Sequence, residues 1–137
     1  MKPKVGISTF LHQDNFYFNG DPNTIVSCAL YLQNTNKENG CLRIIPGSHE
    51  IGILPHDANS HIEGIKWIDE SKLNPNWILD LELEAPYAVF FNINMIHGCY
   101  PNTSEGTRFS LAWEYIESSN NNVATSHDNW CDRNLAG

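Results

Sequence analysis

Short hydrophobic runs, rich in β-branched and aromatic residues, alternate along the chain with clusters of Gly, Pro, Asn and Asp. This pattern is typical of strands joined by turns, and helical periodicity is weak along nearly the whole sequence. It predicts strands near residues 5–10, 25–33, 41–46, 77–84, 88–95 and 108–116. Because no helices separate these strands, we expect an all-β fold built from antiparallel layers.

The most regular alternation lies in residues 78–84. Leucines stand at every second position, and acidic residues stand between them: Leu79, Leu81 and Leu83 against Asp80, Glu82 and Glu84. Successive side chains of a strand point to opposite faces. The pattern therefore predicts a half-buried strand whose leucines face the core.

Two connecting segments stand out between the expected strands. Residues 36–40 resemble a tight hairpin turn in which Gly40 supplies a positive φ angle. Residues 50–76 form a long insertion with at most one short helix, and long loops in compact β domains often cover a site. We expect this insertion to be a lid.

The number and spacing of the strands favour a sandwich or barrel. A double-stranded β-helix, the jelly-roll or cupin-like barrel, is the small version that encloses a central cavity, and it is the fold class that we predict. The length of 137 residues fits one domain. We assign residues 1–117 to the β-helix core and the Ser- and Asn-rich residues 118–137 to a polar C-terminal tail.

Composition excludes several classes of partner. Sixteen acidic residues outnumber eight basic ones, and the basic residues are scattered, which argues against a nucleic-acid surface. No apolar run approaches the roughly twenty residues that cross a bilayer, so we expect no membrane partner. The four cysteines form no C-x-x-C pair and the first residues lack the apolar core of a signal peptide, which predicts reduced thiols and a cytoplasmic location.

His12-Gln13-Asp14 places an imidazole and a carboxylate two residues apart. On an extended backbone the two side chains leave on the same side and can converge on one ion. His97, which precedes Gly98, is a suitable third ligand from a distant strand. Two histidines and one carboxylate form the ligand set of non-haem iron(II) oxygenases, which leaves coordination positions open. The alternative is a turn with a surface His and Asp, because an isolated H-x-D motif is common by chance.

Arg108 follows His97 by eleven residues, and Ser110 and Ala112 share its strand face. An arginine that faces into a β cavity needs an anion. A dicarboxylate cosubstrate would supply one, with its distal carboxylate bound by Arg108, assisted by Ser110, while its other end chelates the metal. The alternative is an arginine paired at the surface.

The opposite face of the same strand carries four large apolar groups, Phe109, Leu111, Trp113 and Tyr115. A monomer rarely leaves such a face in water. We expect it to be buried in a homodimer or beneath the C-terminal tail.

Three stretches resemble the phytanoyl-CoA dioxygenase family of iron(II)- and 2-oxoglutarate-dependent oxygenases. They are His12-Gln13-Asp14, then residues 39–49 (NGCLRIIPGSH), then Ile96-His97-Gly98 with Arg108 beyond. The resemblance covers about residues 5–116, although relatives usually carry a longer region before the first metal histidine.

The resemblance implies a double-stranded β-helix, iron(II) at His12, Asp14 and His97, and 2-oxoglutarate at Arg108. It also implies a dioxygenase that uses O2 to hydroxylate a small organic substrate at an unactivated C–H bond. By the same resemblance, Cys99 stands where a small hydroxyl residue helps to bind the cosubstrate, and Leu30 where an aromatic residue lines its pocket.

Two other functional classes stay open. One is a truncated, non-catalytic β domain that keeps the metal ligands, and the other is a cupin-like zinc or manganese protein. Among the other candidate residues, we expect His49 to make a structural hydrogen bond and do not expect His56, Asp57 and His61 to form a second metal site. Cys28, Cys41 and Cys99 are better explained as small core residues than as nucleophiles.

Overall fold

The computed structural model describes residues 8–59 and 66–118. Its strands are β1 (Thr9–His12), β2 (Ile25–Tyr31), β3 (Leu42–Ile44), β4 (Ala58–Asn59), β5 (Lys66–Trp67), β6 (Leu79–Asp80), β7 (Tyr87–Asn92), β8 (His97–Cys99) and β9 (Ser110–Ile116). Its helical segments are short: α1 (Asn15–Phe18) and the 3₁₀ helices η1 (Ser48–Ile51), η2 (Glu70–Lys72) and η3 (Pro75–Trp77).

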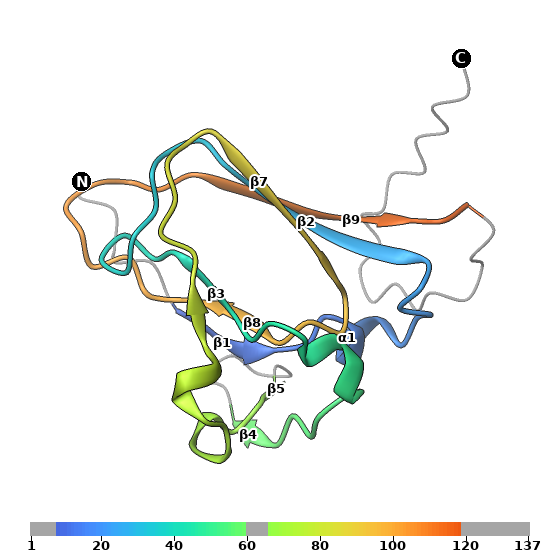
Figure 1. Ribbon diagram of the computed structural model, residues 1–137. Coiled ribbons are helices and arrows are strands. Elements are labelled where there is room, and N and C mark those ends of the chain that lie inside the picture. The colour runs from blue at the N-terminus through green and yellow to red at the C-terminus, as the bar shows by residue number, and fades with distance from the viewer. Residues whose placement is uncertain (1–7, 60–65, 119–137) are drawn as a thin grey trace.

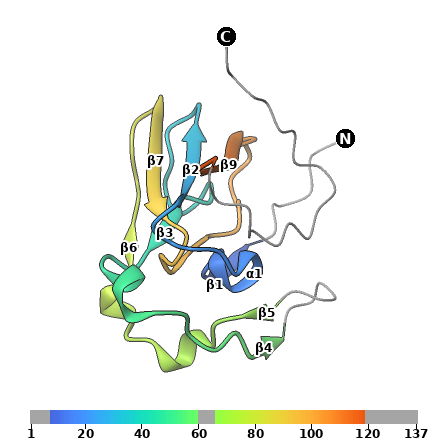
Figure 2. The same ribbon diagram turned by 90° about the vertical axis from the view of Figure 1, so that its right-hand side faces the viewer.

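Two antiparallel sheets face each other across the molecule (Figure 1). One has four strands in the order β1-β8-β3-β6, and the other has three in the order β7-β2-β9. β4 and β5 pair with each other as a separate two-stranded sheet beneath the four-stranded one (Figure 2). This arrangement confirms the predicted all-β, jelly-roll class of fold.

β2 lies at the centre of the three-stranded sheet, and its alternation sets which residues face the other sheet. Ser27, Ala29 and Tyr31 are all buried or nearly so. Ala29 and Tyr31 pack with Leu42 of the opposite sheet in one hydrophobic cluster. The facing surfaces of the two sheets therefore enclose a hydrophobic core around Tyr31 and Leu42. Polar residues line the remaining part of the space between the sheets.

The turn before β3 has the predicted positive φ angle at Gly40, but it is not a hairpin, because β2 and β3 belong to different sheets. Gly40 has a φ of 86°, and a Cβ at this position would lie 2.7 Å from the carbonyl oxygen of Tyr100. Asn36 and Asn39 close the turn through reciprocal bonds from backbone amide to side-chain oxygen of 2.8 and 2.9 Å. Only glycine meets both the backbone angle and the close approach.

The expected strand at residues 77–84 is wrong in extent and in its buried face. Only Leu79 and Asp80 form β6. Their partner strand β3 has just three residues, so it cannot pair with the whole expected strand. Leu79 and Leu83 are 49% and 41% exposed, whereas Leu81 packs against the core. The leucines therefore do not form one buried row. Of the strand expected at 5–10, residues 5–7 lie outside the described residues, and residues 9 and 10 begin β1.

The described part of the insertion at 50–76 packs beneath the four-stranded sheet, on the side away from the second sheet (Figure 2). Its members Leu54, Ile68 and Leu73 contact Leu11 and Ile96. A second anchor is polar: the buried guanidinium of Arg43 donates two hydrogen bonds, of 2.9 and 2.6 Å, to the Glu70 carboxylate. This part of the insertion supports the sheet from outside, so the prediction of a lid is wrong for it.

Among residues 8–59 and 66–118, no helix is long and apolar enough to cross a membrane. The assignment of 118–137 as a separate tail stays a prediction, since residues 119–137 lie outside the described part of the chain.

Candidate metal centre

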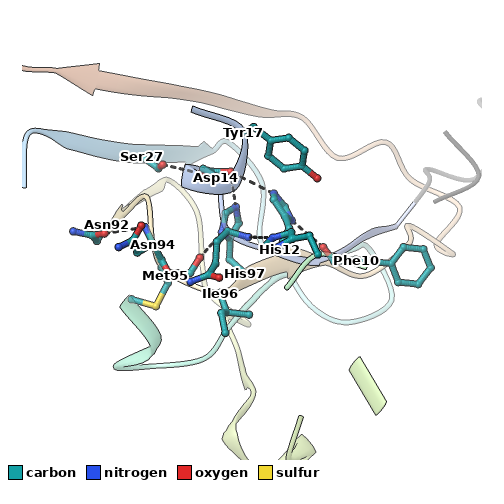
Figure 3. Close-up of polar contacts among 12 residues, drawn as sticks. Phe10, His12, Asp14, Tyr17, Ser27, Asn92, Asn94, Met95, Ile96 and His97 are labelled. Carbon is teal, nitrogen blue, oxygen red and sulfur yellow. Dashed lines mark hydrogen bonds and ion pairs between the residues drawn. The ribbon is translucent and has the colours of Figure 1, made fainter. Parts of the chain in front are cut away.

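His12, Asp14 and His97 converge between the two sheets. His12 ends β1, Asp14 follows the strand, and His97 begins the neighbouring strand β8, where it is the register partner of His12. One ligand atom from each residue lies within 4.8 Å of the other two. Figure 3 shows both imidazoles turned toward the Asp14 carboxylate, whose Oδ1 lies 3.3 Å from His12 Nε2 and 3.5 Å from His97 Nε2.

The backbone between His12 and Asp14 differs from the expected extended strand. Asp14 has φ −56° and ψ −36°, the right-handed helical region, and directly precedes α1. The two side chains converge because the chain turns at this point and not because of strand alternation. The expected convergence is correct, but the reason for it was wrong.

Each histidine of the centre has its ring fixed by its own strand. His12 Nδ1 lies 2.9 Å from the carbonyl oxygen of Phe10, and His97 Nδ1 lies 3.0 Å from that of Met95. A carbonyl oxygen only accepts, so each Nδ1 donates its proton to the backbone and each Nε2 is the ring nitrogen left to bind a metal. Both Nε2 atoms face the Asp14 carboxylate, which is how metal-ligating histidines are usually oriented.

The carboxylate is held from the other sheet. Ser27 of β2 donates a hydrogen bond of 2.8 Å from its hydroxyl to Asp14 Oδ2, which leaves Oδ1 facing the histidines (Figure 3). Burial acts to raise the pKa of Asp14, but the contact with His12, the nearby His97 and the Ser27 hydroxyl outweigh it and keep the pKa below its usual value. Asp14 is therefore ionised near neutral pH.

His97 has the opposite preference. Burial lowers its pKa, although the Asp14 charge acts to raise it. A neutral imidazole beside an ionised carboxylate is the protonation state that a divalent metal requires of its ligands.

Gly98 allows β8 to approach β1 closely enough to bring the histidines together. A Cβ on Gly98 would lie 2.5 Å from the Thr9 carbonyl oxygen and 2.9 Å from that of Phe10. Because both contacts are backbone atoms, any side chain at this position would push the two strands apart. The absence of a side chain at Gly98 therefore permits close contact between the strands.

A cavity of about 320 Å³ opens beside the three ligands. Ser110, Ala112 and Glu114, the inward row of β9, form one of its walls, together with Arg108, which lies two residues before the strand begins. The predicted orientation of Arg108, Ser110 and Ala112 toward the interior is thus seen. No residue of the described insertion lines this cavity, which agrees with the position of the insertion beneath the sheet.

Arg108 is held in place within this cavity. Its Nε donates to the carbonyl oxygen of Asn39 at 3.0 Å, and its Nη1 donates to the Ser110 hydroxyl at 2.9 Å. The guanidinium carbon lies 5.4 Å from the centre of the Tyr31 ring. No carboxylate pairs with Arg108 among the described residues, so the reading as an arginine paired at the surface is not supported.

The resemblance also named Cys99 and Leu30, and only Cys99 lines the cavity. Burial raises the pKa of the Cys99 thiol, which disfavours a thiolate nucleophile. Leu30, in contrast, pairs in register with Leu111, whose side chain is on the exposed face. Its neighbour Tyr31 is one of two aromatic residues that line the cavity, with Phe91, so the expectation for Leu30 was displaced by one residue. A shift by one position moves a side chain to the other face of a strand.

Gln13 is a buried residue of the centre that the sequence did not distinguish from a spacer. It is fully buried, and its amide donates to the carbonyl oxygens of Gly52 and Asn94 at 2.8 and 2.7 Å. Its side-chain oxygen accepts from the amide of Leu54 at 2.8 Å. Gln13 thereby ties the strand that carries His12 to the insertion and to the turn before β8. The one feature of the sequence that could have indicated this role is the position of Gln13 between two candidate metal ligands.

The other histidines do not complete a second centre in the described structure. His56 accepts a hydrogen bond from the Gln13 amide at Nε2, and its Nδ1 donates to the carbonyl oxygen of Leu54. Both ring nitrogens are therefore occupied. Asp57 pairs with Lys72 at 3.1 Å, and His61 lies outside the described residues. His49 is on η1 and takes no part in the described metal-ligand cluster, and its buried Nδ1 has no hydrogen-bond partner among the described residues, so the expected structural hydrogen bond is not seen.

The outer face of the β7-β2-β9 sheet is open in the described part of the chain. Phe109, Leu111 and Tyr115 are 62%, 56% and 55% exposed, and Phe90 of β7 adds a further 62% exposed ring. The expected burial of this face by a second copy or by the tail stays a prediction.

Comparison with known proteins identifies related sequences. The family model of phytanoyl-CoA dioxygenase (PhyH) matches residues 1–110. The phytanoyl-CoA dioxygenase domain-containing protein 1 homolog of Dictyostelium discoideum is 30% identical over 132 residues, which cover 93% of this chain and 47% of that protein. The peroxisomal phytanoyl-CoA dioxygenase of Homo sapiens is 30% identical over 116 residues, 79% of this chain and 33% of that protein. The chain thus spans half or less of the length of these relatives.

Two solved structures have a fold similar to that of this chain. The non-heme monooxygenase ThoJ, in its apo form, superposes with a TM-score of 0.67 at 28% identity, over 82% of this chain and 41% of ThoJ. EvdO2 from Micromonospora carbonacea var. aurantiaca, complexed with 2-oxoglutarate, superposes with a TM-score of 0.66 at 25% identity, over 92% of this chain and 51% of EvdO2.

Proposed function

This chain belongs to the phytanoyl-CoA dioxygenase family, and from that premise we propose that it is an iron(II)- and 2-oxoglutarate-dependent dioxygenase that hydroxylates a small organic substrate at an unactivated C–H bond. The observation that carries the proposal is that His12, Asp14, His97 and Arg108 all line one cavity. A metal-ligand cluster alone fits several classes of protein. The anchored arginine in the same cavity favours a dicarboxylate cosubstrate.

The donor set fits iron(II). Two neutral imidazoles and one ionised carboxylate on one side of an ion leave other positions for cosubstrate and oxygen. When bound, iron(II) supplies oxygen activation coupled to the oxidative decarboxylation of 2-oxoglutarate. The contribution of the chain is to hold the three ligand atoms within 4.8 Å of one another, with Ser27 and the backbone carbonyls fixing their orientation.

The cosubstrate would lie along the inward row of β9. Arg108 has its Nε fixed by Asn39, so its guanidinium plane is already oriented before any carboxylate arrives. The Ser110 hydroxyl, now bonded to Nη1, is in reach of the same carboxylate. Cys99 lies in this cavity as well, beside the arginine, and its contribution would be contact and not charge.

The alternative classes differ in what they would bind. A non-catalytic metal domain would bind the ion without 2-oxoglutarate, and a cupin-like zinc or manganese protein would not select iron(II). The orientation of Arg108 favours the oxygenase over both. Because the chain spans half or less of its relatives, turnover and substrate belong to the proposal.

The test is spectroscopic. The apo-protein, mixed anaerobically with iron(II) and 2-oxoglutarate, is expected to show the weak visible charge-transfer band of the metal–keto-acid chelate. Asp14→Ala should abolish the band. Arg108→Ala should raise the 2-oxoglutarate concentration needed for half-maximal absorbance by about 10- to 100-fold, the effect of losing a charge-assisted pair.

Two results would count against the proposal. A wild-type protein without the band would remove cosubstrate binding. A band that is unchanged in Arg108→Ala would leave the metal centre and remove the role of the arginine.

Among partners, the proposal needs a small-molecule substrate and O2, and neither nucleic acid nor a membrane. The cytoplasmic location stays a prediction, although a human relative is named as peroxisomal.

A further inference from the structure

Glu114 is an acidic residue of the metal cavity with no role in the account so far. It lies on the inward row of β9 and pairs in register with Ser27, the residue that bonds to Asp14. It is half-buried, and among residues 8–59 and 66–118 no other residue's side chain forms a hydrogen bond or ion pair with it. A partly buried carboxylate without a partner gains from a bound cation, so this position is suited to a positively charged ligand.

Arg108 cannot be that partner. Arg108 precedes β9, and its guanidinium bonds to the Ser110 hydroxyl; within the strand, Ser110 and Glu114 are four positions apart, which separates their Cα atoms by about 13 Å. The metal centre lies toward the Glu114 end of the row, because Ser27, the register partner of Glu114, donates to Asp14, whereas Arg108 bonds to Asn39 and Ser110 at the other end. A cosubstrate that runs from Arg108 to the metal therefore leaves the Glu114 end of the cavity free.

The charges of the complete site leave Glu114 unmatched. The two negative charges of 2-oxoglutarate balance the two positive charges of iron(II). The carboxylate of Asp14 balances the guanidinium of Arg108. Glu114 is then the one remaining charge among the ionisable residues that line the cavity, given neutral ligand histidines.

From this placement and charge count we propose that Glu114 is a specificity-determining residue that receives a cationic nitrogen of the substrate. The inference rests on the proposed function and names the substrate class: a small organic ammonium compound, bound with a C–H group beside its nitrogen turned toward the metal. An uncharged or acidic molecule of the same shape would leave the carboxylate unpaired or repelled.

The experiment uses the full chain loaded with zinc(II), which is diamagnetic, and 2-oxoglutarate. Saturation-transfer NMR measures the binding of three probes of matched shape: n-butylammonium, n-butanol and butyrate. We expect n-butylammonium to bind most tightly, and Glu114→Gln to weaken its binding by about tenfold, the effect of one charge-assisted hydrogen bond. Glu117→Gln, at an exposed acid beyond the end of β9, is the matched control and should bind all three probes like wild type.

The iron(II)–2-oxoglutarate charge-transfer band is recorded for the same three proteins. If the band forms in all of them but n-butylammonium binds no better than n-butanol, or binds equally to Glu114→Gln, the substrate class is wrong and the proposed function stands. If Glu114→Gln weakens the binding of n-butanol as much as that of n-butylammonium, Glu114 selects a hydrogen-bond donor and not a cation. This result also overturns the inference. If wild type forms no band, the proposed function fails and the inference fails with it.

Discussion

Ser27 and Asp14, thirteen residues apart in sequence, are joined by a hydrogen bond of 2.8 Å that crosses from one sheet to the other. This bond fixes which oxygen of the carboxylate faces the histidines. We expect Ser27→Ala to weaken binding of iron(II) by about tenfold, as removal of such supporting bonds usually does. Anaerobic metal titration of the variant checks this, with Ser27→Thr as the control that keeps the hydroxyl. Unchanged affinity in Ser27→Ala would show that the bond does not orient the ligand.

Gly98 permits the contact between β1 and β8, so Gly98→Ala is expected to separate the two histidine-bearing strands. The added Cβ would overlap the carbonyl oxygen of Thr9, which lies 2.5 Å away and belongs to the backbone. We expect a loss of about 1–3 kcal/mol in the free energy of unfolding, together with weaker metal binding. Urea denaturation measures the first quantity.

The matched control is Gly106→Ala, whose Cβ would meet nothing closer than the Ser104 hydroxyl at 4.0 Å. It should leave both quantities close to wild type. Equal behaviour of the two variants would contradict the close-contact explanation.

Gln13 is expected to stabilise the centre through its three buried bonds. Gln13→Leu keeps the volume but leaves the amide of Leu54 and two carbonyl oxygens without their partner. Each unpaired buried group costs about 1–3 kcal/mol, so the variant should lose more than about 2 kcal/mol of stability or fail to fold. Gln33→Leu, which removes one exposed bond to the amide of Phe109, should lose less than about 1 kcal/mol. Comparable losses in both variants would refute a special role for Gln13.

His56 should make the apo-protein less stable in mild acid. Burial lowers its pKa in the folded protein below the ordinary value of 6.5, and protonation at Nε2 would break the bond from the Gln13 amide. The unfolded chain therefore takes up this proton first as the pH falls. Its contribution to stability is fully present above pH 6.5 and declines as the pH falls from there toward the folded pKa.

The prediction for His56 is a free energy of unfolding that decreases from pH 7 to pH 5, with a shallower decrease in His56→Asn. Urea denaturation at a series of pH values measures both slopes. The same slope in the variant would show that another group causes the acid sensitivity.

The outer face of the β7-β2-β9 sheet tests the expected homodimer. Leu111 and Tyr115 on β9 are both more than half exposed in the described structure, with Phe90 beside them. Sedimentation-velocity centrifugation should detect a concentration-dependent dimer that Leu111→Asp abolishes. A wild-type protein that stays monomeric at all concentrations would refute self-association through this face.

The sequence predicted those parts of the fold in which the alternation of inward and outward side chains agrees with the pairing of strands that are distant in sequence. β2 and β9 are seven residues each and pair along their whole length, so the inward positions of Ser110 and Ala112 followed from the pattern, whereas Arg108 lies two residues before the strand. The convergence of His12, Asp14 and His97 was predicted from residue type and resemblance. The all-β class followed from the density of turn residues.

Other features of the fold and of the site depend on contacts with distant segments, which the residue pattern of a single strand does not predict. The alternation at 77–84 is regular, but β3 is too short to pair with all of it. The side of β2 that faces the cavity was misassigned at Leu30, since a pattern of apolar residues on both faces does not fix which one is inside. The roles of Gln13 and Gly98 depend on backbone atoms from distant segments, which no spacing in the sequence reveals.

The most direct test of the account is turnover of the cosubstrate at the proposed centre. Wild-type protein with iron(II), 2-oxoglutarate and air should form succinate, even slowly and without substrate. Asp14→Ala should form none, and replacing iron(II) with zinc(II) should stop the reaction. Succinate formation that survives Asp14→Ala, or its absence from iron-loaded wild type, would contradict the claim that His12, Asp14 and His97 form an oxygenase centre.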